Sequence, residues 1–268
     1  DEHYAAPFTD ADGDGYHEFA EGKQDLLVTA YADSFDVVLN WEAWSGPAVN
    51  LDLEVYDTEG NLLRASNTVQ TTGGRGPVES IVLPTRQRKT FVVRIKGVDN
   101  PPPVPLQIFT VGSTPEILTP EGSLATPADA THAFTVGAIR WDTDRLEDYS
   151  SQGPRVDGLL KPDIAGQSVV STAVYAGQRP PTKFNGTSAA APHVSGAAAL
   201  FLAANPGATP DDIRAFLQGR AIDLEEPGPD NKTGAGALQL GAPPQGGAPG
   251  VLPTPPARAS VTPPRATA

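Results

Sequence analysis

The sequence predicts two kinds of fold in one chain, an all-β sandwich or jelly roll in the first half and part of an α/β domain in the second. Between residues 25 and 112, short runs that alternate apolar and polar side chains are separated by turn-forming residues, as in antiparallel sheets. After residue 126, a continuous apolar run and a long apolar helix are typical of a buried parallel sheet covered by helices. We therefore expect the sandwich at 25–112 and the α/β part at 113–242.

The composition restricts the class of partner. The 268 residues carry 19 basic and 32 acidic side chains, a formal net charge of −13, which argues against nucleic acid or an anionic membrane as partner. No apolar run is long enough to span a membrane. Cysteine is absent, which excludes disulfides and thiolate metal sites. Methionine is also absent and no signal peptide is visible, so we interpret the chain as a processed product or a piece of a longer one.

The first 24 residues form an acidic loop that contains glycine. Asp10, Asp12 and Asp14 stand at alternate positions, a glycine follows the third, and Glu21 stands at the twelfth place. This is the spacing of a calcium loop, because a hard cation needs several carboxylate oxygens on a tightly turning backbone. The flanking sequence is not helical, so the loop is not an EF-hand. A structural calcium site with the three aspartates as ligands and a plain solvated turn are equally open.

Seven short strands are expected in residues 25–112. Their alternating pattern, with a hairpin turn at 57–60, favours an antiparallel sandwich or jelly roll. Nothing in this part has catalytic spacing, so we interpret it as structural or accessory. Its aromatic residues could form a ligand platform, although aromatic residues in strands more often belong to a core; they are Tyr31, Trp41, Trp44 and Tyr56. The expected strands are 26–29, 35–41, 51–56, 61–64, 78–83, 90–96 and 106–110.

The second half begins with a linker rich in proline, serine, threonine and glycine at 113–126. A helix is expected from Pro210, with Thr209 as its N-cap and two acidic residues in its first turn. Residues 243–268 hold eight prolines and no aromatic residue, so we expect a disordered tail. Between these segments we expect a buried strand at 133–139, a further strand at 169–172, loops at 149–154 and 160–166, and a closing turn and strand at 233–240.

The stretch from Phe184 to Gly196 leads into a helix that is apolar on every side, which predicts a position inside a larger domain. Ser188 would lie in the first turn of this helix, where unpaired N–H groups and the positive end of the helix dipole favour an anion. A nucleophile that attacks a carbonyl group needs such an anion site. From these residues alone, a nucleophilic Ser188 and a simple helix cap at Thr187 or Ser188 are equally open.

Five motifs occur in order between residues 126 and 240, and such a series is far more specific than a lone Gly-Thr-Ser. They are Phe134-Thr-Val-Gly-Ala138, Tyr149-Ser-Ser-Gln-Gly-Pro154, Lys161-Pro-Asp-Ile-Ala165, the stretch Gly186–Gly196 and Gly234-Ala-Gly-Ala-Leu238. Together they resemble the C-terminal half of the catalytic domain of subtilisin-like serine peptidases, the subtilases. Residues 10–112 additionally resemble a β-rich insert or pre-peptidase-like domain found in some bacterial subtilases, so we expect the sandwich at 25–112 to be inserted before the serine-bearing part.

The resemblance implies that Ser188 is the nucleophile of a serine endopeptidase, and that its backbone N–H is one oxyanion-hole donor. It also implies a three-layer fold with a parallel sheet and a substrate cleft lined by Gly153, Pro154 and Thr187. No motif for the aspartate and histidine of the triad, or for the asparagine of the oxyanion hole, precedes Ser188. We expect all three in an upstream half of the catalytic domain. This chain alone is then expected to be inactive. The intact enzyme is expected to cleave peptides or proteins outside the cell or in the cell envelope.

The histidines in the chain offer poor substitutes for the missing base. His193 follows Ser188 by five positions on one helix, so its ring does not face the hydroxyl. His132 with Asp163 would give a triad in another order, with no support from their spacing. Two rival functions stay open: a pseudo-peptidase whose other half lacks the triad partners, and a calcium-dependent sandwich that binds a ligand. The remaining histidines, His3 and His17, lie in polar stretches and are expected at the surface.

Overall fold

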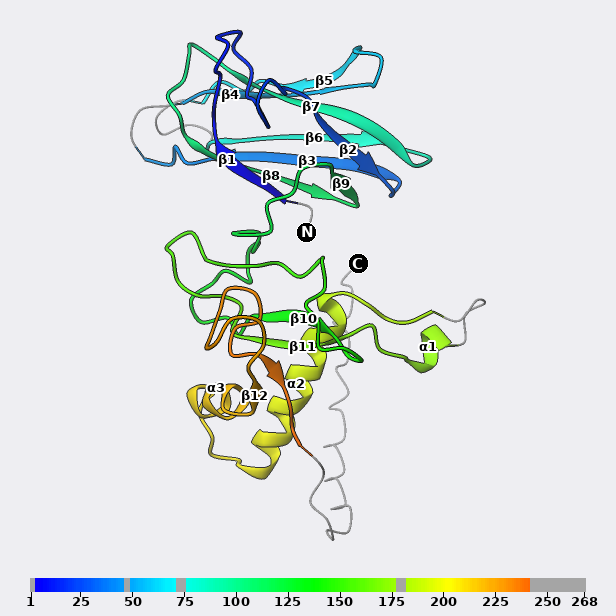
Figure 1. The fold of residues 1–268 in the computed structure, drawn as a ribbon, viewed down its shortest axis with the longest axis vertical. Helices are drawn as coiled ribbons and strands as arrows, with labels where there is room; N and C mark the ends of the chain where they lie inside the picture. The colour runs from blue at the N-terminus through cyan, green and yellow to red at the C-terminus, as the bar shows by residue number, and fades with distance from the viewer. Residues whose placement is uncertain (1–2, 46–48, 71–75, 177–181, 242–268) are drawn as a thin grey trace, which may run out of the picture.

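The computed structural model describes residues 3–45, 49–70, 76–176 and 182–241. A β-sandwich forms one end of the molecule and a smaller α/β unit forms the other (Figure 1). The predicted tail at 243–268 lies outside the described residues.

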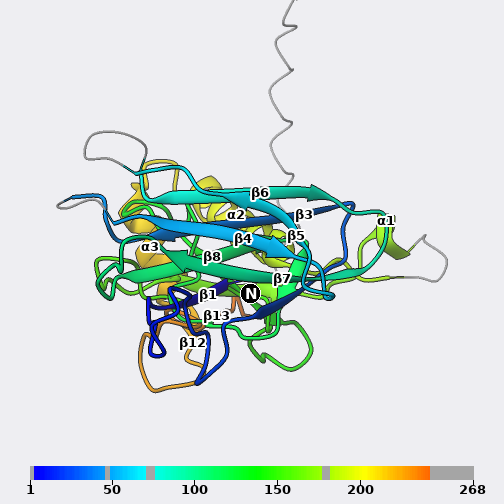
Figure 2. The same ribbon diagram turned by 90° about the horizontal axis from the view of Figure 1, so that it is seen from above.

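The sandwich consists of two antiparallel sheets, one with the order β1-β8-β3-β6 and the other with the order β5-β4-β7-β2-β9. Figure 2 shows the two sheets stacked along the view. The chain passes from one sheet to the other at every connection except that between β4 and β5, an alternation typical of jelly-roll domains. The strands are β1 (His3–Pro7), β2 (Leu26–Ala30), β3 (Ser34–Trp41), β4 (Leu51–Tyr56), β5 (Leu62–Ser66), β6 (Val78–Pro84), β7 (Lys89–Gly97), β8 (Pro105–Val111) and β9 (Ser113–Pro115).

The alternating sequence explains how the two sheets pack. Every second side chain of β3 is buried, and Phe35 on that strand stacks on Phe91 of the opposite sheet with 4.4 Å between the ring centroids. Burial of one face of each sheet supplies the main stabilisation of such a sandwich. All seven predicted strands are present. The sandwich also extends beyond the predicted 25–112, because β1 pairs with β8 and β9 pairs with β2.

Two histidines that were expected at the surface are buried in the sandwich, His3 at 1% and His17 at 0% exposure. His3 donates from Nδ1 to the main-chain oxygen of Thr119 at 2.7 Å. His17 accepts at Nδ1 from the main-chain N–H of Thr9 at 3.1 Å, and its Nε2 lies 3.0 Å from the Tyr4 hydroxyl. The expectation was wrong because the polar segments that contain these residues fold back onto β7 and β8.

Stability of the sandwich should fall in mild acid because of these histidines. Burial lowers the pKa of His17 from 6.5 to about 4, and burial also lowers the pKa of His3. The folded state binds the His17 proton more weakly than the unfolded chain does. The stability that neutral His17 contributes is therefore fully present above pH 6.5 and is lost as the pH falls toward 4. Between pH 6.5 and 5, His17 alone should remove roughly 2 kcal/mol of the free energy of unfolding.

Urea unfolding at these two pH values measures the effect. The variant His17→Gln should lose a large part of the pH dependence, whereas His132→Gln, at an exposed histidine, should retain it. Equal pH dependence in wild type and His17→Gln would contradict the assignment.

The α/β unit contains a sheet with the order β10-β11-β13-β12, in which β10, β11 and β13 run parallel. Helix α2 packs on β10 and β11, and α3 packs on α2. The predicted N-cap of α3 is confirmed, since Thr209 and Asp212 form a reciprocal capping box. The elements are β10 (Val136–Arg140), β11 (Ile164–Ser168), α1 (Ala173–Ala176), α2 (Thr187–Ala204), α3 (Pro210–Gln218), β12 (Ala221–Ile222) and β13 (Ala237–Leu238).

Two details of the predicted α/β part were wrong. The strand expected at 169–172 lies instead at 164–168, which overlaps the loop expected at 160–166. Val169 ends it with a φ of 60°, which a strand does not adopt. Helix α2 is also not buried on every side. Within the described residues one face packs on the sheet, while Leu200 is 60% exposed. The complete three-layer domain therefore remains an expectation for the intact protein.

Candidate active site

Ser188 is the second residue of α2 and its side chain is exposed. The N-cap of the helix is Gly186, with a φ of 110° and no side-chain capping bond, so Thr187 and Ser188 do not serve as caps. In the described part of the chain, the N–H groups of Thr187 and Ser188 have no hydrogen-bond partner, and the first bond back to Gly186 comes from Ala189 at 2.9 Å. An exposed hydroxyl thus lies beside free donors at the positive end of an 18-residue helix.

Small residues hold the first turns of α2 close to the sheet. A Cβ atom on Gly166 of β11 would lie 2.6 Å from the main-chain oxygen of Ala190, so only glycine allows this approach. Ala189 and Ala190 are fully buried against the sheet. The close contact fixes the first turns of α2 against β11, and α2 runs away from the sandwich (Figure 1).

A three-residue cluster fixes the turn that precedes Ser188. The main-chain N–H of Gly186 donates to the Ser168 hydroxyl at 3.0 Å and lies 3.1 Å from the Tyr149 hydroxyl. Ser168 donates to the main-chain oxygen of Gly186 at 3.1 Å and accepts from Tyr149 at 2.8 Å. The sequence did not single out Ser168, because no motif includes it and only its complete burial reveals the role.

The three residues that the sequence places in a substrate cleft have different surroundings. The main-chain N–H of Gly153 donates to the oxygen of Asn231 at 2.8 Å, and its carbonyl accepts from Gly122 at 3.0 Å. Gly153 is buried, and its N–H and C=O groups both have partners within the protein. Pro154 is half-buried and Thr187 is exposed beside Ser188, so these two present surface to a ligand.

Neither candidate base lies in position to serve Ser188. The Nδ1 of His193 is hydrogen-bonded to the main-chain oxygen of Ala189 on its own helix at 2.7 Å. His132 lies at the rim of a separate cavity of about 370 Å³ between α2, α3 and the start of β10. Within the described residues, no histidine is hydrogen-bonded to Ser188. The general base of a serine peptidase must therefore come from outside this arrangement.

Asp163 belongs to a buried ion cluster and has no contact with a histidine among the described residues. Its carboxylate accepts from Lys161 at 2.5 Å, from the main-chain N–H of Thr135 at 2.6 Å, and from Arg214 of α3. Lys161 also donates to the main-chain oxygen of Ala133 at 2.6 Å. The cluster ties the segment before β10 and the start of β11 to α3, which indicates a structural role.

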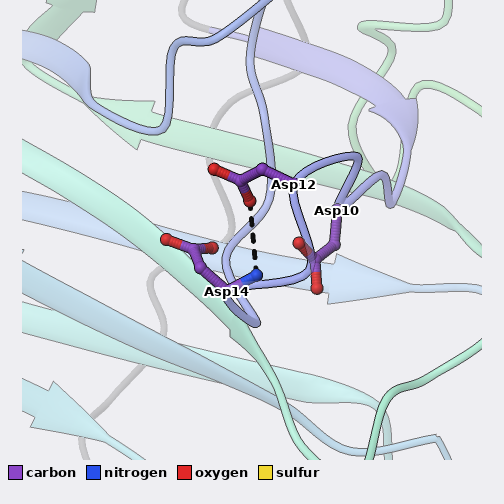
Figure 3. A group of neighbouring side chains, drawn as sticks. All are labelled: Asp10, Asp12 and Asp14. Atoms are coloured by element: carbon purple, nitrogen blue, oxygen red, sulfur yellow. Dashed lines mark hydrogen bonds between the residues drawn. The ribbon is translucent and has the colours of Figure 1, made fainter.

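The three aspartates of the acidic loop lie around one tight turn of the sandwich domain (Figure 3). Each offers an oxygen within 4.8 Å of the others, and Glu21 is not part of the group. Asp10 accepts from Gly13 and Gly15, at 2.8 and 3.0 Å. Figure 3 marks the bond that Asp12 accepts from the N–H of Asp14 at 3.3 Å. The amide of Gln24 donates to both Asp12 and Asp14, so a neutral donor already binds two of the three carboxylates.

Comparison with known proteins agrees with this geometry. Residues 107–236 match the model of the subtilase family. Bacillopeptidase F of Bacillus subtilis is 34% identical over 120 residues, which cover 44% of this chain and 8% of that protein. The extracellular serine proteinase of a Thermus strain is 43% identical over 91 residues, which cover 34% of this chain and 21% of that protein. The chain thus spans less than a quarter of the length of these two relatives.

A solved structure extends the likeness over both parts of the chain. The CspB protease of Clostridium perfringens superposes with a TM-score of 0.57 and 18% identity, over 88% of this chain and 54% of that one. At this identity the likeness concerns the fold. The family match begins within β8 and ends just before β13, and it includes Ser188 with the turn that positions it. Residues 107–236 are therefore similar to the subtilase family in sequence.

Proposed function

We propose that this chain supplies the nucleophile-bearing part of a serine endopeptidase, with Ser188 as the nucleophile. The observation that carries the proposal is the exposed Ser188 hydroxyl at the uncapped N-terminus of α2, beside free N–H groups. The subtilase match over 107–236 supports the same reaction class. The base that activates the serine and the residue that orients it are assigned to another part of the protein.

The reaction that fits this geometry is acyl transfer. The Ser188 oxygen attacks the carbonyl carbon of a peptide bond while its proton passes to the histidine base. The carbonyl oxygen gains negative charge, which the N–H of Ser188 and the helix dipole stabilise. The amine leaves with the proton from the histidine, and an ester remains on Ser188. Water, deprotonated by the same histidine, then attacks the ester and releases the acid.

The exposed apolar face of α2 supports the assignment of the missing groups to another part of the catalytic domain. Leu200 and Leu202 lie exposed on this helix although its composition suits a buried position. A helix of this kind in a subtilase is expected to be covered by further elements of the same domain. We assign the covering role to the segment that carries the triad histidine, the aspartate and the oxyanion asparagine.

Hydrolysis of a quenched fluorescent peptide tests this proposal. The intact protein should cleave the peptide, and the 268-residue chain alone should not, because its Ser188 has no base. An intact protein that folds but shows no hydrolysis would indicate the pseudo-peptidase alternative. Cleavage by the 268-residue chain alone would show that the base is misassigned.

The setting proposed for the enzyme is outside the cell or in the cell envelope. The similarity to a proteinase named as extracellular supports this setting. Among the described residues, no helix has the length and apolar character needed to cross a membrane. We interpret the sandwich as an accessory domain of the pre-peptidase kind, on the basis of its two-sheet architecture.

A structural calcium ion on Asp10, Asp12 and Asp14 is a further proposal, supported by the convergence of the three carboxylates. Binding would displace the Gln24 amide and stabilise the folded sandwich.

Calcium at a hundred times its Kd should raise the free energy of unfolding by about 2.7 kcal/mol. The variant Asp12→Ala should lose this gain, and Asp33→Ala, at an exposed aspartate of the same domain, should keep it. Thermal unfolding with calcium and with a chelator tests for the ion. Equal midpoints of wild type in the two conditions would contradict the calcium proposal.

A further inference from the structure

A cavity of about 440 Å³ lies on the sandwich sheet that faces the α/β unit. Its lining comes from β1, β3, β8 and the segments that flank them, together with Val156 of the α/β unit. Val156 follows the predicted cleft residue Pro154 by two positions. The cavity thus lies at the junction of the two domains, where binding sites are common.

Trp44 forms an apolar side of this cavity. A Cβ atom on Gly76 would lie 2.6 Å from Cζ3 of the Trp44 ring, so the ring rests on a backbone position that only glycine leaves open. The side chain nevertheless remains 69% exposed, unlike Trp41, which is part of the core. Val156 also lines the cavity and is 92% exposed. Two large apolar side chains that stay exposed at one cavity provide a contact surface for a ligand.

The floor of the cavity carries two amide groups side by side. Asn40 of β3 and Gln107 of β8 are direct partners in the antiparallel register, so their side chains lie on the same outer face of the sheet. Gln107 also faces Ala5 of β1, whose small side chain leaves room above it. Within the described residues, neither amide has a side-chain hydrogen bond. Each therefore has a donor and an acceptor free for a ligand.

Among the described residues that line the cavity, Glu42 is the charged one. Glu42 contributes a carboxylate at its edge, and in the described residues that carboxylate takes part in no ion pair. A chain of net charge −13 repels acidic ligands, and Glu42 adds to this locally. The ligand should therefore be neutral or positively charged.

We propose that this cavity, here named the Trp44 cavity, binds an extended peptide segment with an apolar and a basic side chain. The apolar side chain packs on Trp44 and Val156, and Glu42 faces the basic one. Asn40 and Gln107 bond main-chain N–H and C=O groups of the peptide. The choice of a peptide rests on the proposed peptidase function and on the continuity with Pro154, so the segment would belong to a protein substrate. A neutral sugar stacked on Trp44 is the other ligand chemistry to be tested.

Fluorescence anisotropy of a labelled peptide tests the proposal in the 268-residue chain. The probe is a fluorescein-labelled octapeptide that alternates phenylalanine with lysine, compared with the same peptide carrying glutamate for lysine. We expect saturable binding of the lysine peptide, weakened about 30-fold by Trp44→Ala. Gln107→Leu should weaken it about threefold to tenfold. The matched control is Tyr31→Ala, which removes an exposed aromatic side chain of the same domain outside the cavity and should bind as wild type.

Each outcome decides the proposal. No saturable binding, or equal binding by Trp44→Ala and Tyr31→Ala, overturns it. Binding of maltose or cellobiose at Trp44 without peptide binding also overturns it and assigns a sugar instead. Equal thermal midpoints for the variants exclude unfolding as the cause of a loss. Because the assay needs no hydrolysis, its result is independent of whether the intact protein is a peptidase.

Discussion

Ser188→Ala is expected to lower kcat of the intact protein by about 10⁶-fold, with little change in KM. This is the scale of loss when a subtilisin loses its nucleophile, because the remaining triad members cannot act without it. The side chain is exposed and makes no hydrogen bond within the described residues, so its removal should leave the fold intact. Hydrolysis of the quenched peptide by wild type and variant measures the ratio.

The matched control is Ser195→Ala, which removes an exposed hydroxyl seven residues later on the same helix. This variant should hydrolyse the peptide at the wild-type rate. Comparable losses in both variants would indicate damage to α2 in general. Survival of hydrolysis in Ser188→Ala would remove Ser188 from the reaction.

Asp163→Ala is expected to cause the largest loss of stability, about 3–5 kcal/mol in the free energy of unfolding of the α/β unit. Removal of the carboxylate leaves the buried ammonium of Lys161 without its counter-ion, and it leaves the N–H of Thr135 without an acceptor. Arg214 loses the contact that holds α3 to the start of β11. Urea unfolding followed by circular dichroism measures the loss.

Asp211→Ala provides the comparison for this loss, because Asp211 is exposed on the same helix as Arg214. Its effect should stay within about 0.5 kcal/mol. A double variant Lys161→Met, Asp163→Leu should recover only part of the stability, because it removes the unpaired buried ammonium but leaves the Thr135 N–H and Arg214 without their acceptor. A loss in Asp163→Ala no larger than that in Asp211→Ala would show that the cluster is not structural.

The sandwich could be predicted from the sequence because its strands each bury one face. In β3 and β4 the alternation of apolar and polar residues follows the burial almost residue by residue. The strands β1 and β9 lack this signal, since each is short and contains proline. Their pairing with β8 and β2 depends on distant residues, which a local pattern does not contain.

The strands of the α/β unit were harder to predict from the sequence, because its close packing requires small residues. Strand β11 contains Gly166, which allows the close approach of α2, and Ala165, which packs with Ile139 and Ala237; neither has strand character. The apolar composition of α2 predicted burial on all sides, whereas in this chain one side packs on the sheet. That composition fits a partner surface that the described residues do not supply.

The order of the motifs singles out Ser188 as the candidate nucleophile, whereas the surroundings of Ser188 could not be predicted from the sequence. The sequence left open whether Thr187 or Ser188 caps the helix, and the backbone of Gly186 removes this alternative. The three-residue cluster around Gly186 depends on the side chains of Tyr149 and Ser168, which are 19 residues apart in the sequence. For Gly153 the motif predicts a place in the substrate cleft, but its backbone N–H and C=O groups are bonded within the protein.

Covalent labelling by a fluorophosphonate probe tests the central claim most directly, because the probe reacts only with an activated serine. Peptide mass spectrometry after labelling of the intact protein should place the adduct on Ser188. The 268-residue chain alone should show hardly any adduct, since its Ser188 has the helix N-terminus but no base. An intact, folded protein that remains unlabelled at Ser188, or an adduct on another serine, would contradict the account.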